Sequence, residues 1–186
     1  PIKEHKELFR LPDNVHIFSA TKPELVLVNN EDGRPIAAIS GQSYSQKWEK
    51  TPLQEHYPTT KENVFRIAML HTQLETGRSN YIPVSQGELS KHTAFDYWAL
   101  GHIHQPQIIQ SENPVIAYSG IPQGRDFGEQ GFGGCWLVEV DPLYGSGSFK
   151  VQMEYQVTSS IIYKTYSIDI GCSELAKADS LDQLEE

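Results

Sequence analysis

Three histidines follow apolar segments of this sequence, and their spacing suits metal binding. His102 and His104 stand one residue apart directly after the apolar segment 97–100, and His71 follows the apolar run 64–70. Imidazole is the commonest neutral metal ligand in proteins. A glycine before the pair removes a side chain where the backbone has to approach such a site. We therefore predict that His71, His102 and His104 are metal ligands.

The alternative for each histidine is an ordinary structural role. A single histidine after a strand is more often a hydrogen-bonded residue than a ligand, and one His-x-His pair is a weak motif by itself. An apolar strand, Gly101, the pair and a second histidine at a strand end together favour metal binding. The remaining histidines lack this setting, and we assign none of them to the site: His5, His16, His56 and His92.

The surrounding sequence predicts a sheet-rich fold of the α/β or α+β class. Apolar or alternating segments predict strands over 15–18, 24–28, 35–41, 64–70, 97–100, 115–118, 136–140, 148–157 and 161–170. Asp32-Gly33 predicts a hairpin turn between the second and third of these strands. Parallel strands present ligands at their carboxyl ends, so we expect the three histidines to converge there.

Few segments favour helices. Ser85 followed by Glu88 is typical of a capping box and predicts a short helix over 85–92. We also expect helical turns within 2–10, one turn within the polar loop 42–63, and a helix that begins near Ser180. Helices are therefore expected to be a minor part of the fold.

Composition limits the classes of protein. The chain has 186 residues and 38% hydrophobic residues, enough for a real core, and no apolar run long enough for a transmembrane helix. The first ten residues are charged and do not form a signal peptide. Two cysteines, Cys135 and Cys172, are too few for a disulfide framework, so we expect a reducing, cytoplasmic setting with Cys135 as a buried thiol.

Charge argues against a broadly basic nucleic-acid surface. The net charge is −9, and the segment 172–186 is markedly acidic. A phosphodiester substrate is still compatible with this charge, because bound divalent cations supply positive charge. DNA binding by this chain alone is therefore disfavoured.

Other polar and aromatic residues have simpler interpretations beside their functional ones. Arg125, in the glycine-rich loop 119–134, either binds a phosphate or stabilises the loop through a surface ion pair. Asp96 is more simply a strand-entry residue than one that orients a catalytic group. Trp98 and Trp136 lie on strand patterns and are expected in the core.

Four stretches of the sequence carry a family resemblance: Leu70-His71, Phe95 to His104, Tyr118 to Arg125 and Gly134 to Val140. Together they resemble the second half of a calcineurin-like metallophosphoesterase domain. Within that superfamily, roughly residues 14–170 look most like the bacterial DNA-repair exonucleases of the SbcD type. The resemblance implies a sandwich of two mixed sheets flanked by helices, with the N-terminal half missing from this chain.

The resemblance also implies a division of the chain and a set of partners. Residues 1–157 would form the C-terminal half of the phosphoesterase domain, and residues 158–186 would begin a following, capping-type domain. Family members of this type hydrolyse DNA and work with a coiled-coil ATPase subunit. We therefore expect DNA, such an ATPase and a second copy of the parent protein as partners, and no membrane.

The family binds two divalent metal ions, typically Mn²⁺. By resemblance, His71 and His102 would bind one ion and His104 the other, and a metal-bound hydroxide would hydrolyse the phosphodiester bond. The His motifs are shared across the superfamily, so a phosphatase or a cyclic-nucleotide phosphodiesterase is an alternative. A non-enzymatic scaffold that has lost the metal cluster is a further alternative of a different class.

The family's other metal motifs are absent from the sequence. Neither Asp-x-His, Gly-Asp-x-x-Asp nor Gly-Asn-His-Asp occurs. The bridging Asp, the metal-binding Asn and the His that protonates the leaving group are therefore missing. Three imidazoles without a bridging carboxylate do not hold two ions at the separation that hydrolysis needs. We expect this chain by itself to be inactive, as part of a parent hydrolase.

Overall fold

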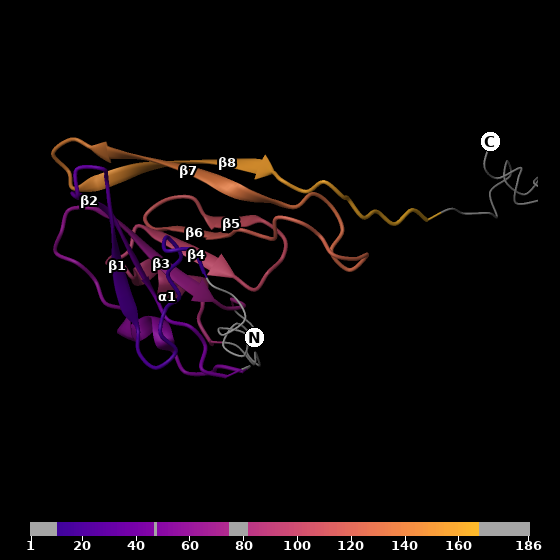
Figure 1. Cartoon of the computed structure of the whole chain (residues 1–186), viewed down its shortest axis with the longest axis horizontal. Helices are drawn as coiled ribbons and strands as arrows, with labels where there is room; N and C mark the ends of the chain where they lie inside the picture. The colour runs from indigo at the N-terminus through magenta and orange to yellow at the C-terminus, as the bar shows by residue number, and fades with distance from the viewer. Residues whose placement is uncertain (1–10, 47, 75–81, 168–186) are drawn as a thin grey trace, which may run out of the picture.

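A mixed six-stranded sheet and a two-stranded hairpin make up the described part of this protein (Figure 1). The computed structural model describes residues 11–46, 48–74 and 82–167. The strands are β1 (Glu24–Asn29), β2 (Pro35–Gly41), β3 (Phe65–His71), β4 (Tyr97–Gly101), β5 (Gln107–Gln110), β6 (Val115–Tyr118), β7 (Gly134–Leu143) and β8 (Ser148–Val157). The described helices are short: α1 (Gln86–Lys91) and a 3-10 turn, η2 (Leu53–His56).

The large sheet has the strand order β1-β2-β3-β4-β6-β5. The four central strands β2, β3, β4 and β6 run parallel, and β1 and β5 flank them antiparallel. All four central strands therefore end at one edge of the sheet. At that edge His71 is in register with Gly101, and Leu100 is in register with Tyr118. This register brings the residues that follow β3, β4 and β6 together.

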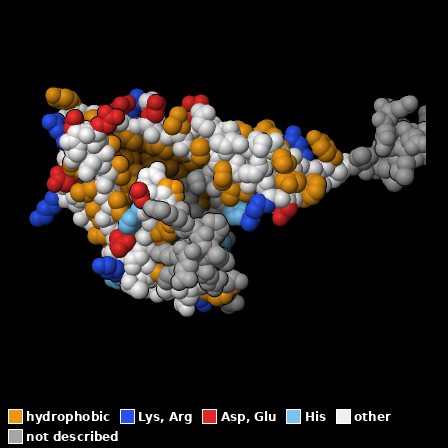
Figure 2. Space-filling view, in the orientation of Figure 1, with side chains coloured by type: hydrophobic (Ala, Val, Ile, Leu, Met, Phe, Trp, Pro, Cys, Tyr) orange, Lys and Arg blue, Asp and Glu red, His pale blue; other side chains and the backbone are white. Residues whose placement is uncertain are grey.

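The β7–β8 hairpin covers part of one face of this sheet (Figure 1). Phe65, Tyr97 and Val115 are buried on that face and contact alternate residues of the hairpin. The rings of Phe65 and Phe149 meet edge to face, with centroids 5.4 Å apart. Beside this contact, hydrophobic side chains line a hollow below the hairpin (Figure 2). The hairpin is thus attached to the sheet by apolar packing.

The opposite face carries the larger core. Trp98 is completely buried there and lies among Leu89 of α1, Ile82 and Tyr57. The rings of Tyr57 and Trp98 stack with centroids 6.4 Å apart. The core position predicted for Trp98 is confirmed. Trp136 is half-buried on β7, where its indole N–H donates to the carbonyl of Tyr118 at 2.9 Å.

Most predicted elements are present within one or two residues. The hairpin turn between β1 and β2 has Gly33 at φ +75°, a conformation that glycine adopts without strain. The capping box of α1 is formed in both directions between Ser85 and Glu88. The loop 42–63 contains the one helical turn expected, at Leu53–His56. The strand β5 was not predicted.

The expectation of two mixed sheets flanked by helices is met in part by the described residues, which are mostly β: two sheets are present and the larger one is mixed, but helices are almost absent. The second sheet is a two-stranded antiparallel hairpin, and α1 is the one α-helix in the part of the chain that the structure describes. The connection from β2 to β3 contains Pro52 and Pro58, and proline disfavours a continuous helix there. The connection from β4 to β6 is made by β5, an antiparallel strand, in place of a helix.

Two predicted strands are not strands. Residues 15–18 lie without strand pairing. The Phe18 ring lies close enough to Gly41 that an added Cβ there would approach it to 3.0 Å. Residues 161–167 are extended but do not pair with a strand. They form hydrogen bonds with the glycine-rich loop instead; for example, the Gln123 side chain donates to the carbonyl of Ile161 at 2.9 Å.

The prediction that Cys135 is buried is also wrong. Cys135 is exposed on β7, because the alternation of that strand turns its neighbours Trp136 and Val138 toward the sheet. The predicted helices at 2–10 and near Ser180, together with His5 and Cys172, lie outside the described residues. No helix in the described ranges combines the length and the apolar character needed to cross a membrane.

Candidate metal centre

His71 and His102 are neighbours at the carboxyl edge of the sheet. His71 ends β3, His102 directly follows β4, and their ring centroids are 5.2 Å apart. Parallel pairing of β3 and β4 places both residues at this edge. A Cβ added to Gly101 would lie 3.2 Å from Nδ1 of His71, so the glycine leaves room for that imidazole. The pair is thus brought together as the sequence predicted.

His102 has a backbone conformation that a side chain rarely adopts. Its φ is +101°, outside the regions that L residues prefer. Such a conformation costs on the order of 1–3 kcal/mol and is concentrated at functional sites. The strain at His102 therefore suggests that the position of this imidazole matters more than local stability.

Partial desolvation favours the neutral form of the two neighbouring imidazoles. Desolvation lowers the pKa of His71, and the nearby His102 and His104 lower it further. Desolvation also lowers the pKa of His102, with a smaller contribution from His104. Neutral imidazole has the lone pair that a metal ion needs. Tyr44 supports the pair from one side, because its hydroxyl donates to the backbone carbonyl of His71.

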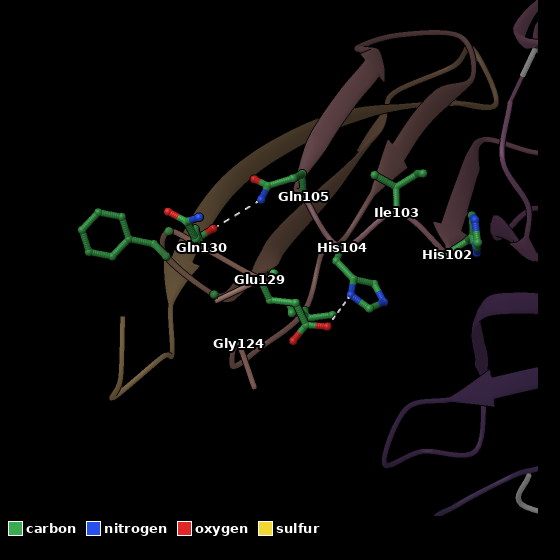
Figure 3. A pocket seen from close by; sticks show the side chains of 12 residues that line it. His102, Ile103, His104, Gln105, Gly124, Glu129 and Gln130 are labelled. Carbon is green, nitrogen blue, oxygen red and sulfur yellow. Dashed lines mark hydrogen bonds and ion pairs between the residues drawn. The ribbon is translucent and has the colours of Figure 1, made fainter. Parts of the chain in front are cut away.

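His104 is directed toward a carboxylate on the glycine-rich loop (Figure 3). Its Nδ1 lies 2.7 Å from Oε1 of Glu129. Both residues line a pocket of about 200 Å³ together with several loop glycines. Glu129 is missing from the sequence predictions, because nothing in the loop sequence distinguishes it from other exposed acids.

Arg125 is bound to the same carboxylate. Its Nη2 lies 2.6 Å from Oε1 of Glu129, and its Nε donates to Oε2 at 3.1 Å. The guanidinium holds the pKa of Glu129 at about 2, well below its usual range. The surface ion pair considered for Arg125 is therefore present, and its phosphate contact stays a prediction.

Asp96 lies away from this edge. It precedes β4 at the amino end of the strand, and its carboxylate accepts two side-chain bonds from Arg66, at 2.7 and 2.9 Å. It also accepts the backbone N–H of Arg66 at 2.8 Å. This geometry joins β3 to β4 and matches the strand-entry interpretation.

The chemistry of two of the described histidines is compatible with metal binding. His71 and His102 fit two neutral nitrogen ligands of a divalent ion. Within the described ranges, no group of three or more His, Cys, Asp and Glu residues is arranged to hold a metal ion. His104 faces Glu129 instead of joining the pair. The donor set therefore fits a site that takes further ligands from elsewhere.

The sequence is 34% identical over 161 residues to the uncharacterized metallophosphoesterase YhaO of Bacillus subtilis (strain 168). This chain is a distant homologue of a metallophosphoesterase. The aligned region is 86% of the chain and 38% of the relative's length. No protein-family model matches the sequence.

Proposed function

We propose that this chain forms part of the active site of a metal-dependent phosphodiesterase that hydrolyses DNA. The observation that carries the proposal is the pair of adjoining imidazoles of His71 and His102, whose pKa values desolvation lowers, at the carboxyl ends of adjacent parallel strands. The distant homology to a metallophosphoesterase supports the same chemistry. Nuclease activity of the SbcD type is the more specific part of the proposal.

The histidines would share two divalent ions, for which we propose Mn²⁺. His71 and His102 would bind one ion, and His104 would bind the other through Nε2, the nitrogen that does not face Glu129. When bound, such ions supply Lewis acidity and activate water at neutral pH. The remaining oxygen ligands and the proton donor for the leaving group would come from outside the described residues.

The chain's own residues would hold and orient this site. Gly101 gives the His71 ring its space, and the backbone at His102 fixes the direction of the second imidazole. The Arg125 side chain is 74% exposed and bound to Glu129 on one side. We propose that its exposed side contacts a substrate phosphate. A guanidinium suits this role because it presents several donors in a planar fork.

The proposal extends to the domain division of the chain, its partners and its cellular location. Residues 1–157 would be the C-terminal half of the phosphoesterase domain, with residues 158–186 leading into a capping-type domain. The net charge of −9 disfavours DNA binding by this chain alone, so contact with DNA would depend on metal ions and on a coiled-coil ATPase partner. We also propose a homodimer of the parent protein, in the cytoplasm.

A hydrolysis assay tests the proposal. The protein encoded by the complete reading frame should degrade a single-stranded oligonucleotide in Mn²⁺, and His102→Ala should lower the rate by about 100-fold or more. The chain 1–186 alone should be inactive in the same assay. A matched His56→Ala variant, changed in a surface histidine away from the edge, should retain full activity.

The same assay separates the alternatives. Hydrolysis of p-nitrophenyl phosphate or a cyclic nucleotide without DNA degradation would favour the phosphatase or cyclic-nucleotide phosphodiesterase. No hydrolysis of any phosphoester, with no Mn²⁺ bound, would favour a scaffold and overturn the proposal. Robust turnover by the chain 1–186 alone would contradict the expectation that essential ligands lie outside it.

A further inference from the structure

We propose that Glu129 is a positioning residue that fixes the His104 imidazole with its proton on Nδ1, so that Nε2 is free to bind a metal ion. The inference rests on the proposed function, because the metal ion it serves is the one proposed there. It assigns a role to an acidic residue of the glycine-rich loop that no sequence motif indicates.

The contact between the two side chains defines the direction of the imidazole. Nδ1 of His104 lies 2.7 Å from Oε1 of Glu129 (Figure 3). An ionised carboxylate only accepts hydrogen bonds, so Nδ1 must carry the proton. In the neutral ring the lone pair is then on Nε2. A carboxylate behind a metal-binding histidine commonly sets the tautomer and raises the basicity of the ligand nitrogen.

Arg125 holds the carboxylate in place. The guanidinium binds both oxygens of Glu129, and the backbone N–H of Arg125 donates to Oε2 at 2.9 Å. The Glu129 side chain is only 11% exposed, whereas that of Arg125 is 74% exposed. Three donors from Arg125 thus leave the carboxylate little freedom to rotate away from His104.

The loop is folded so that this carboxylate can reach the strand end. A Cβ added to Gly124 would come within 2.5 Å of the carbonyl oxygen of Glu129, so glycine allows the loop to close on itself. The Glu129 N–H donates to the carbonyl of Asp126 at 3.0 Å within the same turn. The loop therefore presents Glu129 to His104 from a fixed backbone position.

A stability role alone does not explain this arrangement. Arg125 and Glu129 form an ion pair within one loop, and a pair with one largely exposed partner contributes little to stability. The link to His104 crosses from the loop to the end of β4. This hydrogen bond fixes the orientation of the His104 imidazole. An experiment on the role of Glu129 must therefore measure that orientation.

Nitrogen NMR of the full chain, labelled with ¹⁵N-histidine and free of metal at pH 8, measures the tautomer. The wild-type protein should show His104 protonated at Nδ1. Glu129→Ala should shift His104 to the Nε2-protonated tautomer that free imidazole side chains prefer. Glu129→Gln should restore the wild-type tautomer, because its amide oxygen still accepts a hydrogen bond.

Affinity for Zn²⁺ gives the second measurement. The affinity should fall by about 10–100-fold in Glu129→Ala. The matched control Glu112→Ala, which removes a carboxylate from another exposed loop, should leave both tautomer and affinity unchanged. Unchanged resonances of His16 and His92 in each variant would show that the fold is retained.

The two proposals fail differently. An Nδ1-protonated His104 in Glu129→Ala, or unchanged Zn²⁺ affinity, would overturn the positioning role while leaving DNA hydrolysis intact. Absence of DNA hydrolysis by the wild-type protein would overturn the proposed function, whatever the tautomer of His104.

Discussion

The backbone at His102 is strained, and this strained conformation sets the position of one imidazole side chain. Its φ of +101° is unfavourable for histidine and natural for glycine. The residue lies between Gly101 and Ile103, so the strain is confined to the turn that directs β4 away from the sheet edge. A residue kept there despite this cost is best explained by its imidazole.

Replacement of His102 by glycine should therefore raise the free energy of unfolding, by about 1 kcal/mol, through relief of backbone strain. The matched change His104→Gly should lower it by about 1–2 kcal/mol, because that residue loses the bond to Glu129 and gains chain entropy when unfolded. Urea denaturation measures both. A loss of stability in His102→Gly equal to that in His104→Gly would contradict the assignment of strain.

Gly101 should matter through the His71 ring. In Gly101→Ala the new Cβ lies 3.2 Å from Nδ1 of His71, so the ring must shift by a few tenths of an ångström. We expect Zn²⁺ affinity to fall by about tenfold. Gly87→Ala is a suitable control, because its Cβ meets nothing nearer than 4.0 Å. Equal affinities in the two variants would show that Gly101 does not shape the site.

At the scale of elements, α1 depends on its cap. Glu88 accepts hydrogen bonds from the backbone and hydroxyl of Ser85, and the backbone bond is the main reason that its pKa lies below the usual value. A lowered folded pKa means that the carboxylate stabilises the folded state above its unfolded pKa. That stabilisation disappears as the pH falls through the folded pKa.

Glu88→Gln should accordingly lower the free energy of unfolding by about 0.5 kcal/mol at pH 7, where the carboxylate also favours the helix N-terminus. The difference from wild type should shrink toward pH 3, because protonated Glu and Gln are then alike. Paired urea titrations across this range measure it. A difference that grows on acidification would contradict the sign derived from the lowered pKa.

The central strands β3, β4 and β6 could be predicted from the sequence, but the edge strand β5 could not. The runs in β3, β4 and β6 are apolar because both faces of the sheet are covered there. The strand β5 contains only two apolar residues, Ile108 and Ile109, between glutamines, which is too short a pattern to recognise. Residues 15–18 show a strand-like pattern but pack over Gly41 instead.

The candidate site was predictable in part. His71, His102 and His104 could be proposed as candidates because the apolar runs before them mark strand ends. Glu129 comes from a loop of glycines and polar residues, whose path depends on close backbone approaches such as that at Gly124. Sequence patterns carry periodicity, and such a loop has none.

At the scale of the whole molecule, the hairpin and the sheet depend on each other. Two strands alone are marginally stable in water, so β7 and β8 need the apolar face of the sheet beneath them. The same hairpin closes the glycine-rich loop, because the Gly134 N–H donates to the carbonyl of Ile121 at 2.9 Å. Loss of the hairpin should therefore also disturb the position of Glu129.

Phe149→Ala should weaken this attachment by about 1.5–3 kcal/mol, since it removes the ring that packs on Phe65. Hydrogen exchange should become faster across β7 and β8 while β3 and β4 stay protected. Leu137→Ala, at an exposed position of β7, is the control and should change little. Uniform acceleration over both sheets in Phe149→Ala would show that they do not separate as units.

Selective metal binding by the histidines at the sheet edge tests the central claim most directly. Ni²⁺ is paramagnetic and binds imidazole nitrogen readily. Added in small amounts to the ¹⁵N-histidine-labelled chain, it should broaden the side-chain resonances of His71, His102 and His104 first. The resonances of His16, His56 and His92 should persist. Equal broadening of all six, or broadening of the second set alone, would contradict a metal site at the ends of β3 and β4.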